Sequence, residues 1–367
     1  MSAATQTETP VETPVETPVE TPQKLFLKSV DDYLGPGEGR FFSRGYQRAE
    51  YLVRDLVSTP VTIERPGIRA TVDVSYPADW SRKKNGTDLR PHLSTVDALV
   101  LGVQLAELHL VHAYGLTGEA RGTMRLRKVV LRAGGAPQED LLRIPASSRL
   151  VRTDDVPGVP GRRLSVHDGA VGELRVRCEI EHDEGVRAED EGVFNSLDEG
   201  LGEGVRRFYG DGFKRRRHVI RDVVVDMEEL SATAGVHFVP GPAEGSGGPG
   251  ALGVDAATEP SVSLVDAFVV NLQLVQVLMY ELDQVNRASS NTLWMMQTVL
   301  TAADTALPLP TRGDEAQTAS ARLTAKRVLP LRGGVWRSVD IEAGLGGVGV
   351  RASFAHELPP EAAASAT

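Results

Sequence analysis

The fold of this chain is decided by the segment Ser29-Val30-Asp31-Asp32-Tyr33-Leu34-Gly35-Pro36-Gly37, which is followed by Arg40-Phe41-Phe42. Both pieces return in the second half of the chain, as Ser196-Leu197-Asp198-Glu199-Gly200-Leu201-Gly202-Glu203-Gly204 and Arg207-Phe208-Tyr209. The match continues without a gap to Arg54-Asp55 and Arg221-Asp222. A segment of this length, repeated once at a long interval, indicates that the chain contains two related halves.

Two further blocks repeat in the same order. Pro91-His92-Leu93-Ser94-Thr95-Val96-Asp97-Ala98 returns as Pro260-Ser261-Val262-Ser263-Leu264-Val265-Asp266-Ala267. A weaker block, Val176-Arg177-Cys178, returns as Val350-Arg351-Ala352. Three blocks with nearly the same spacing between their copies predict a tandem duplication into domain-sized halves, because a solenoid would show a much shorter period. We therefore expect one repeat over residues 24–185 and a second over residues 186–358.

Composition limits the classes of function. A formal net charge of −10 argues against a nucleic-acid binder, whose affinity comes largely from neutralising phosphates. The single cysteine, Cys178, excludes an internal disulfide and fits a reducing, cytoplasmic compartment. Residues 1–23, rich in Thr, Pro and Glu, and residues 359–367 are expected to be disordered tails. No cysteine pair or His-Glu-x-x-His segment occurs, so we expect no metal and no other cofactor.

Each half contains one long apolar segment, at residues 94–114 and 263–282. Each is long enough to cross a bilayer, but polar residues inside it, such as Gln104 and Gln273, favour a helix buried in a soluble core. Strand-like runs follow each helix, and residues 174–180 alternate with a period of two. This order resembles the hot-dog fold. It predicts an α+β tandem, or double, hot-dog: two curled antiparallel sheets, each around one central helix, paired as a pseudo-dimer.

Asp97 and Asp266 occupy matching places in the first turns of the two helices. Hot-dog dehydratases carry a catalytic acid here, and a helix N-terminus also offers N–H groups to a thioester carbonyl. The spacing from Ser94 to Asp97, and from Ser263 to Asp266, equally predicts a capping box. Both readings stay open from sequence.

Two histidines are candidate general bases. His237 lies in Gly235-Val236-His237-Phe238-Val239-Pro240-Gly241, which loosely resembles the His-Phe-Pro-Gly segment of single hot-dog dehydratases. His92 precedes the first helix, and Ser261 replaces it in the second repeat. A histidine near neutral pKa can take a proton from an acceptor hydroxyl. The first half carries Asp73 near the place equivalent to His237. This asymmetry predicts one working site, built from His237 and the helix that carries Asp97. The alternative for His237 is a structural histidine, and the alternative for His92 is a residue that drifted freely after the duplication.

The loop around Trp80, Lys83 and Lys84 has no counterpart in the second half. An aromatic residue beside cations can receive a phosphopantetheine arm or an acidic carrier protein. A solvated basic loop is the alternative. We take Trp80, Lys83, Lys84 and Ser94 as candidate substrate-binding residues.

Three segments together resemble the avirulence protein D (AvrD) family: the opening segment from Ser29, then Tyr76-Pro77-Ala78-Asp79-Trp80-Ser81, and the block from Pro91 to Val100. The resemblance runs from about residue 28 to residue 356. It implies an enzyme of secondary metabolism that makes syringolide-type signal molecules from a β-ketoacyl chain and xylulose. The chemistry is similar to that of the butyrolactone synthases, which are also tandem hot-dog proteins.

We therefore expect a cytoplasmic acyltransferase that moves a β-ketoacyl group from a carrier-protein or CoA thioester to a sugar-like hydroxyl. His237 or His92 would deprotonate the acceptor, and Asp97, with Asp266 as its counterpart, would orient the reactants. One rival is a dehydratase acting on a 3-hydroxyacyl thioester. A second is a non-catalytic protein that binds an acyl or lactone ligand. Neither membrane nor nucleic acid is an expected partner, and a pseudo-dimer of this kind can remain a monomer.

Overall fold

Two long helices, α2 (Thr95–Ala113) and α5 (Leu264–Leu282), lie at the centre of the structure. The computed structural model describes residues 24–80, 90–239, 251–287, 290, 293–305, 307–309, 315–331 and 333–366. Both helices begin at a serine capping box, as the sequence predicts. They are apolar and long enough to cross a membrane, but 89% of each is buried inside the protein. They are core helices around which the rest of the chain folds.

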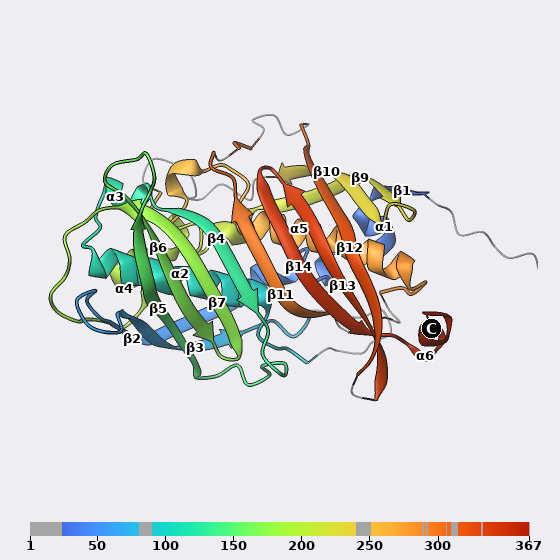
Figure 1. The fold of residues 1–367 in the computed structure, drawn as a ribbon, viewed down its shortest axis with the longest axis horizontal. Helices are drawn as coiled ribbons and strands as arrows, with labels where there is room; N and C mark the ends of the chain where they lie inside the picture. The colour runs from blue at the N-terminus through green and yellow to red at the C-terminus, as the bar shows by residue number, and fades with distance from the viewer. Residues whose placement is uncertain are drawn as a thin grey trace, which may run out of the picture.

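Antiparallel strands curl around each helix (Figure 1). Around α2 lie β2 (Glu50–Ser58), β3 (Gly67–Ser75), β4 (Arg125–Arg132), β5 (Ile144–Asp155), β6 (Arg162–Val171) and β7 (Leu174–Asp183). Around α5 lie β9 (Arg217–Asp226), β10 (Ser231–Val239), β11 (Trp294–Ala302), β12 (Gln317–Leu331), β13 (Gly334–Leu345) and β14 (Val348–Glu357). The same order of elements, two strands, a helix and four strands, thus occurs twice.

The strands form one sheet, which corrects the prediction of two. The strand order is β1-β9-β10-β12-β13-β14-β11-β4-β7-β6-β5-β3-β2-β8. The two halves meet where β11 pairs with β4, with Thr298 opposite Leu131. Each of these strands would otherwise end its half with a row of unpaired backbone groups, and pairing satisfies both rows at once.

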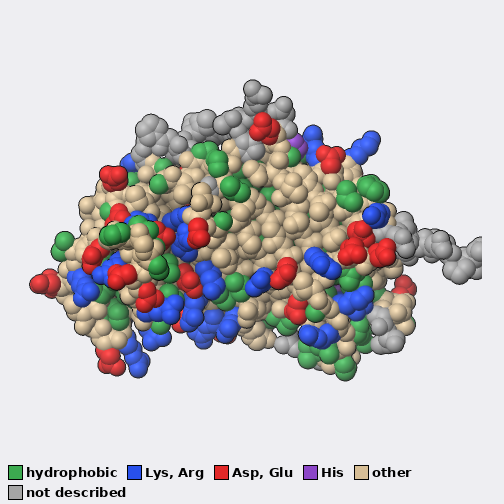
Figure 2. Space-filling model, turned by 45° about the horizontal axis from the view of Figure 1, so that its top comes forward, with side chains coloured by type: hydrophobic (Ala, Val, Ile, Leu, Met, Phe, Trp, Pro, Cys, Tyr) green, Lys and Arg blue, Asp and Glu red, His purple; other side chains and the backbone are tan. Residues whose placement is uncertain are grey.

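Side chains alternate across the sheet. On β7, Leu174, Val176 and Cys178 face inward and are buried, while Arg175 and Arg177 between them are exposed. On the outer face Arg177 pairs with Asp168 of β6 at 2.6 Å. Figure 2 shows charged side chains of both signs mixed over the left half of the molecule. The outer face of the sheet is therefore a solvated surface in this half, and the apolar groups face α2.

The first segment of each repeat packs on the other half. Strand β1 (Lys24–Ser29) pairs with β9, and the short helix α1 (Val30–Leu34) packs against α5. In return, β8 (Gly192–Phe194) pairs with β2, and α4 (Leu197–Leu201) packs against α2. The repeats therefore exchange their opening strand and helix.

Short helices complete the described fold. They are α3 (Glu119–Gly122), α6 (Pro360–Ala366) and five 3₁₀ turns at Gly37–Gly39, Gly45–Arg48, Gly204–Arg206, Gly212–Arg215 and Ala256–Thr258. Helix α6 corrects the prediction that residues 359–367 lack structure. Its alanines favour a helix, and proline is well suited to the first helical position. The predicted tail at residues 1–23 lies outside the described residues.

A chain of polar side chains is buried between α2 and the sheet of the first half. His109 Nδ1 lies 3.0 Å from His167 Nε2, and His182 Nε2 lies 2.8 Å from Ser165 Oγ. Burial lowers the pKa of His109 to about 4, and it also lowers the pKa values of His167 and His182. These histidines are therefore neutral in the folded protein near pH 7.

The buried histidines predict that acid destabilises this half. The unfolded chain binds protons at the ordinary histidine pKa of 6.5, whereas folded His109 binds one only near pH 4. Stability is therefore complete above pH 6.5 and is lost as the pH falls through this window. We expect the double variant His109→Gln, His167→Gln to lose less melting temperature than wild type between about pH 7.5 and pH 5. Equal losses in thermal melts would contradict this origin.

Candidate functional site

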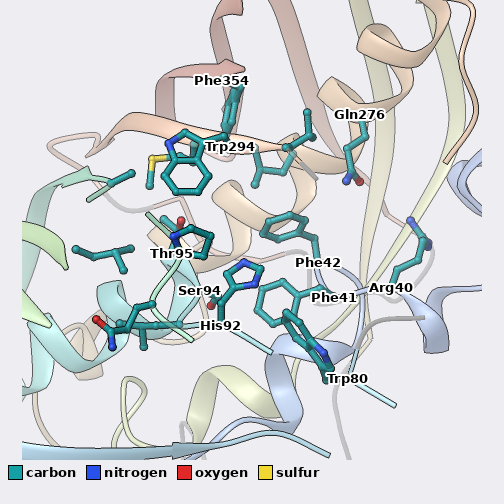
Figure 3. Close-up of a pocket in the computed structure, with 18 of the residues that line it drawn as sticks. Arg40, Phe41, Phe42, Trp80, His92, Ser94, Thr95, Gln276, Trp294 and Phe354 are labelled. Carbon is teal, nitrogen blue, oxygen red and sulfur yellow. The ribbon is translucent and has the colours of Figure 1, made fainter. Parts of the chain in front are cut away.

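A cavity of about 420 Å³ opens between the N-terminus of α2 and the middle of α5 (Figure 3). A volume of this size is typical of sites for small ligands. Its walls come from both halves of the chain and are mostly apolar or aromatic: Phe41, Phe42, Trp80, Leu93, Leu174, Phe268, Leu272, Leu293, Trp294, Met295 and Phe354. Polar groups gather at its two ends, so the cavity can hold a ligand with a long apolar part and two polar parts.

One polar end is the first turn of α2, with His92, Ser94 and Thr95 (Figure 3). The His92 ring is half-buried and meets the Trp80 ring edge-on, with 5.5 Å between centroids. His92 Nδ1 lies 3.3 Å from the carbonyl oxygen of Arg90. If Nδ1 carries the proton and donates it there, Nε2 is left as an acceptor, and the described residues give Nε2 no hydrogen bond. His92 is thus placed to accept a proton from a ligand.

Asp97 lies behind this wall and is fully buried. It accepts hydrogen bonds from Tyr51 Oη at 2.7 Å, from Ser94 N at 2.9 Å, from Ser94 Oγ at 2.6 Å and from Tyr76 Oη. Burial raises the pKa of Asp97, although all these donors oppose the rise. The carboxyl group is occupied by protein donors and is absent from the cavity wall, so its contacts are those of a helix cap.

Replacing Asp97 with alanine is expected to cost about 3 kcal/mol of unfolding free energy, because buried donors lose their acceptor. Urea denaturation of the variant and wild type measures this difference. The matched variant Ser196→Ala removes an exposed cap from the five-residue helix α4 and should cost about 1 kcal/mol or less. A loss below about 1 kcal/mol for Asp97→Ala would contradict a structural role for this carboxylate.

The other polar end of the cavity holds Arg40, Arg287, Gln273 and Gln276. Arg40 donates from Nη1 to Gln273 Oε1 at 2.8 Å and forms an ion pair with Asp31. Burial lowers the pKa of Arg40 to about 10, against the opposing charge of Asp31. Arg40 therefore stays charged near pH 7, inside a largely apolar site.

The equivalent place in the second half is nearly closed, with only about 20 Å³ of space beside Ser261 and Ser263. Arg216 lies beside it and forms an ion pair with Asp266 at 2.6 Å and a second with Glu259. Asp266 also accepts from His218 Nε2 at 2.8 Å. Burial alone would raise the pKa of Asp266, but Arg216 and His218 hold it well below its usual range. The chain thus has one open site and one closed counterpart.

The structure brings together some of the predicted site residues. His92, Ser94 and Trp80 line the open cavity, and Asp97 caps the helix behind them. Asp266 lies at the closed site. Lys83 and Lys84 lie outside the described residues.

His237 lies elsewhere. It is opposite Val219 on the sheet, whereas Val236 and Phe238, its neighbours, share the face of Ile220 and His218 toward α5. His237 therefore points away from the helix, so the structure does not bring it together with Asp97. The histidine that reaches the helix is His218. Its repeat counterpart is Tyr51, which bonds Asp97 in the same way, and this match between the aligned repeats is the signal that could have identified it.

Arg40, Gln273, Gln276 and Arg287 were absent from the predicted site. The sequence does carry a signal for Arg40: the second repeat has an arginine, Arg207, at the same place, and each arginine precedes a pair of aromatic residues. Arg207 bonds Gln104 at 2.9 Å as Arg40 bonds Gln273. A pair that recurs across the halves marks the interface where the cavity lies.

An antiparallel sheet curled around a long central helix defines the hot-dog class, and this chain has that architecture. Within that class, the chain belongs to the AvrD family. The family model described as Pseudomonas avirulence D protein (AvrD) matches residues 24–359. No curated protein matches the chain.

Three solved structures illustrate the resemblance of the chain to known folds. The Mycobacterium avium subs paratuberculosis tesB protein MAP1729c has a TM-score of 0.36 and 7% identity, over 80% of this chain and 93% of that one. The dehydratase domain of the polyketide PpsC from Mycobacterium tuberculosis has a TM-score of 0.33 and 10% identity, over 83% of this chain and 98% of that one. The 12:0-ACP thioesterase from Umbellularia californica has a TM-score of 0.34 and 11% identity, over 73% of this chain and 92% of that one.

Proposed function

We propose that the chain is an acyltransferase that moves a β-ketoacyl group from a thioester to a hydroxyl of a sugar-like acceptor, in the manner of syringolide and butyrolactone synthesis. The observation that carries the proposal is His92 at the wall of the open cavity, next to the first turn of α2. In the closed half the same position is Ser261, which has no basic group. The proposed base and the open space thus occur together.

The proposed reaction is a direct transfer. His92 Nε2 takes the proton of the acceptor hydroxyl, and the acceptor oxygen bonds to the thioester carbonyl carbon. The carbon–sulfur bond then breaks, and the departing thiolate takes the proton back from His92. The first N–H groups of a helix have no intrahelical acceptor, so that of Thr95, which lines the cavity, can stabilise the oxygen that becomes negative.

The apolar wall of the cavity suits the acyl chain. Phe42 and Phe268 meet edge-on with 6.1 Å between centroids, and Phe354 and Trp294 add to the same wall. Transfer of an alkyl chain from water to such a wall is favourable in proportion to its buried area. In this proposal Trp80 lies against the thioester arm of a carrier protein or CoA, and Ser94 beside the acceptor.

We further infer that the two halves are hot-dog units that arose by duplication, and that one of the two sites was kept. The element order and the paired contacts of Arg40 and Arg207 support this origin. We also infer that the protein is cytoplasmic.

The dehydratase reading needs a carboxyl group that acts together with the histidine. Among the described residues that line the cavity, the carboxylate is Glu139, which pairs with Arg90 at 2.6 Å. The carboxylate of Asp97 accepts hydrogen bonds from other side chains of the protein. This arrangement favours transfer over loss of water.

The test is incubation of the full chain with a β-ketoacyl thioester, a 3-hydroxyacyl thioester and D-xylulose, with products read by mass spectrometry. An acylated or cyclised sugar is the expected product. An enoyl thioester from the hydroxyacyl substrate would instead make the protein a dehydratase. Recovery of every substrate unchanged, with a ligand bound, would make it a binding protein.

A further inference from the structure

Two guanidinium groups meet at the end of the cavity that the transfer chemistry does not use. Arg287 donates from Nη2 to the carbonyl oxygen of Gly39 at 3.0 Å, directly beside Arg40. The positive charge of Arg287 lowers the pKa of Arg40, so the two cations affect each other. Figure 3 shows Arg40 and Gln276 on one side of Phe41 and Phe42, and His92 and Ser94 on the other.

The carboxylates near this end, Asp31 and Glu38, act on Arg40 rather than on Arg287. Asp31 pairs with Arg40. Arg287 has no carboxylate partner among the described residues, and burial lowers its pKa. A guanidinium that lacks a counter-ion in a partly buried site is costly, because the surroundings solvate its charge less well than water does.

The closed half provides an internal comparison. Arg207, the counterpart of Arg40, bonds through all three groups: Nε to Gly202 O at 3.0 Å, Nη1 to Gln104 at 2.9 Å and Nη2 to Asp198 at 2.9 Å. Arg40 has the two equivalent Nη bonds, but its buried Nε has no partner among the described residues. When the two repeats are aligned, the residue of the closed half that corresponds to Arg287 is a glycine, Gly118. The closed half does have a second cation near Arg207, but this residue, Arg121, pairs with the buried carboxylate of Glu107 at 3.6 Å. The difference between the halves is therefore that the second cation of the open cavity lacks such a carboxylate within the described part of the chain.

We propose that Arg40 and Arg287 bind an anionic group of the substrate, a phosphate ester or a carboxylate, at this end of the cavity. Arginine presents paired N–H donors that fit the oxygens of both groups. Gln276, which replaces the Glu107 of the closed half, lines the same end without adding a negative charge that would repel the anion. The inference rests on the proposed function for its substrate: the anion is carried by the sugar-like acceptor, whose hydroxyl then lies toward His92.

The test measures binding without any thioester, so it is independent of whether acyl transfer occurs. Isothermal titration calorimetry compares D-xylulose, D-xylulose 5-phosphate and D-xylonate on the full chain. We expect one of the two anions to bind at least about tenfold more tightly than the neutral sugar. In Arg287→Gln, which removes the charge and leaves the Arg40–Asp31 pair intact, this preference should disappear. In Arg175→Gln, on the outer face of β7, it should remain.

Two results would overturn the proposal: equal binding of the three ligands to the wild type, or a preference for the anion that survives Arg287→Gln. The same titration with coenzyme A and pantetheine identifies the source of the anion. A preference for coenzyme A over pantetheine that Arg287→Gln abolishes, together with equal binding of the three sugars, would overturn the acceptor as the carrier of the anion and assign the anion to the thioester carrier. Circular dichroism of both variants shows that a lost preference does not reflect unfolding.

Discussion

Replacing His92 with serine is expected to lower the rate of acyl transfer by at least about 100-fold, because the acceptor hydroxyl loses its general base. Serine is the residue that the closed half carries at this position, as Ser261, so the substitution copies a side chain that this fold already accommodates. The melting temperature should therefore change little. Single-turnover kinetics with a β-ketoacyl thioester and the acceptor measure the chemical step directly.

His237→Ser is the discriminating comparison. His237 is the other candidate base, but it lies on the face of β10 turned away from α5. We expect this variant to transfer the acyl group within about twofold of the wild-type rate, since a surface change of this kind usually has small effects. The reverse result, with activity lost in His237→Ser and kept in His92→Ser, would overturn the assignment of the base.

Replacing Arg216 with methionine is expected to lower the unfolding free energy by about 3–5 kcal/mol, the usual cost of breaking a buried ion pair. Arg216 lies between Asp266 and Glu259, both buried or nearly so. Without it, two carboxylates face each other in a site of low polarity. Glu259 already has a pKa raised to about 7 by burial, so it should bind a proton in the variant. Urea denaturation measures the loss.

Arg163→Met is the matched control for a surface pair. Arg163 bonds Glu184 at 2.7 Å, where the Glu184 side chain is 57% exposed. Pairs of this kind contribute about 0–1 kcal/mol, so the control should retain nearly full stability. A loss in Arg216→Met no larger than in Arg163→Met would show that the closed site does not depend on this pair.

The sequence predicted the elements better than their faces. Repetition located both core helices to within a residue or two, because a buried helix needs a long apolar segment and a cap. It did not identify His218, since a one-residue shift in a strand reverses the face of every side chain. Val236, His237 and Phe238 do alternate apolar and polar side chains, and this pattern alone favours an outward His237.

The cavity itself was beyond local patterns. Arg40 meets Gln273 across 233 residues of chain, and Arg287 reaches Gly39 across 248. Such contacts depend on how the two halves pair. At the closed second site Arg216 lies beside Asp266, whereas its counterpart in the first repeat is Ala49, a small apolar residue that places no charge beside Asp97.

The exchange of β1 and α1 for β8 and α4 has a consequence for how the chain acquires its structure. Each half completes its sheet edge with a strand that the other half's sequence encodes. Synthesis of residues 24–185 alone would supply the helix α2 and its strands, but β2 would still wait for β8. Neither repeat is therefore a self-sufficient folding unit. A separated half would expose strand edges that invite pairing with a second copy, and covalent linkage in one polypeptide keeps the correct partner at high local concentration.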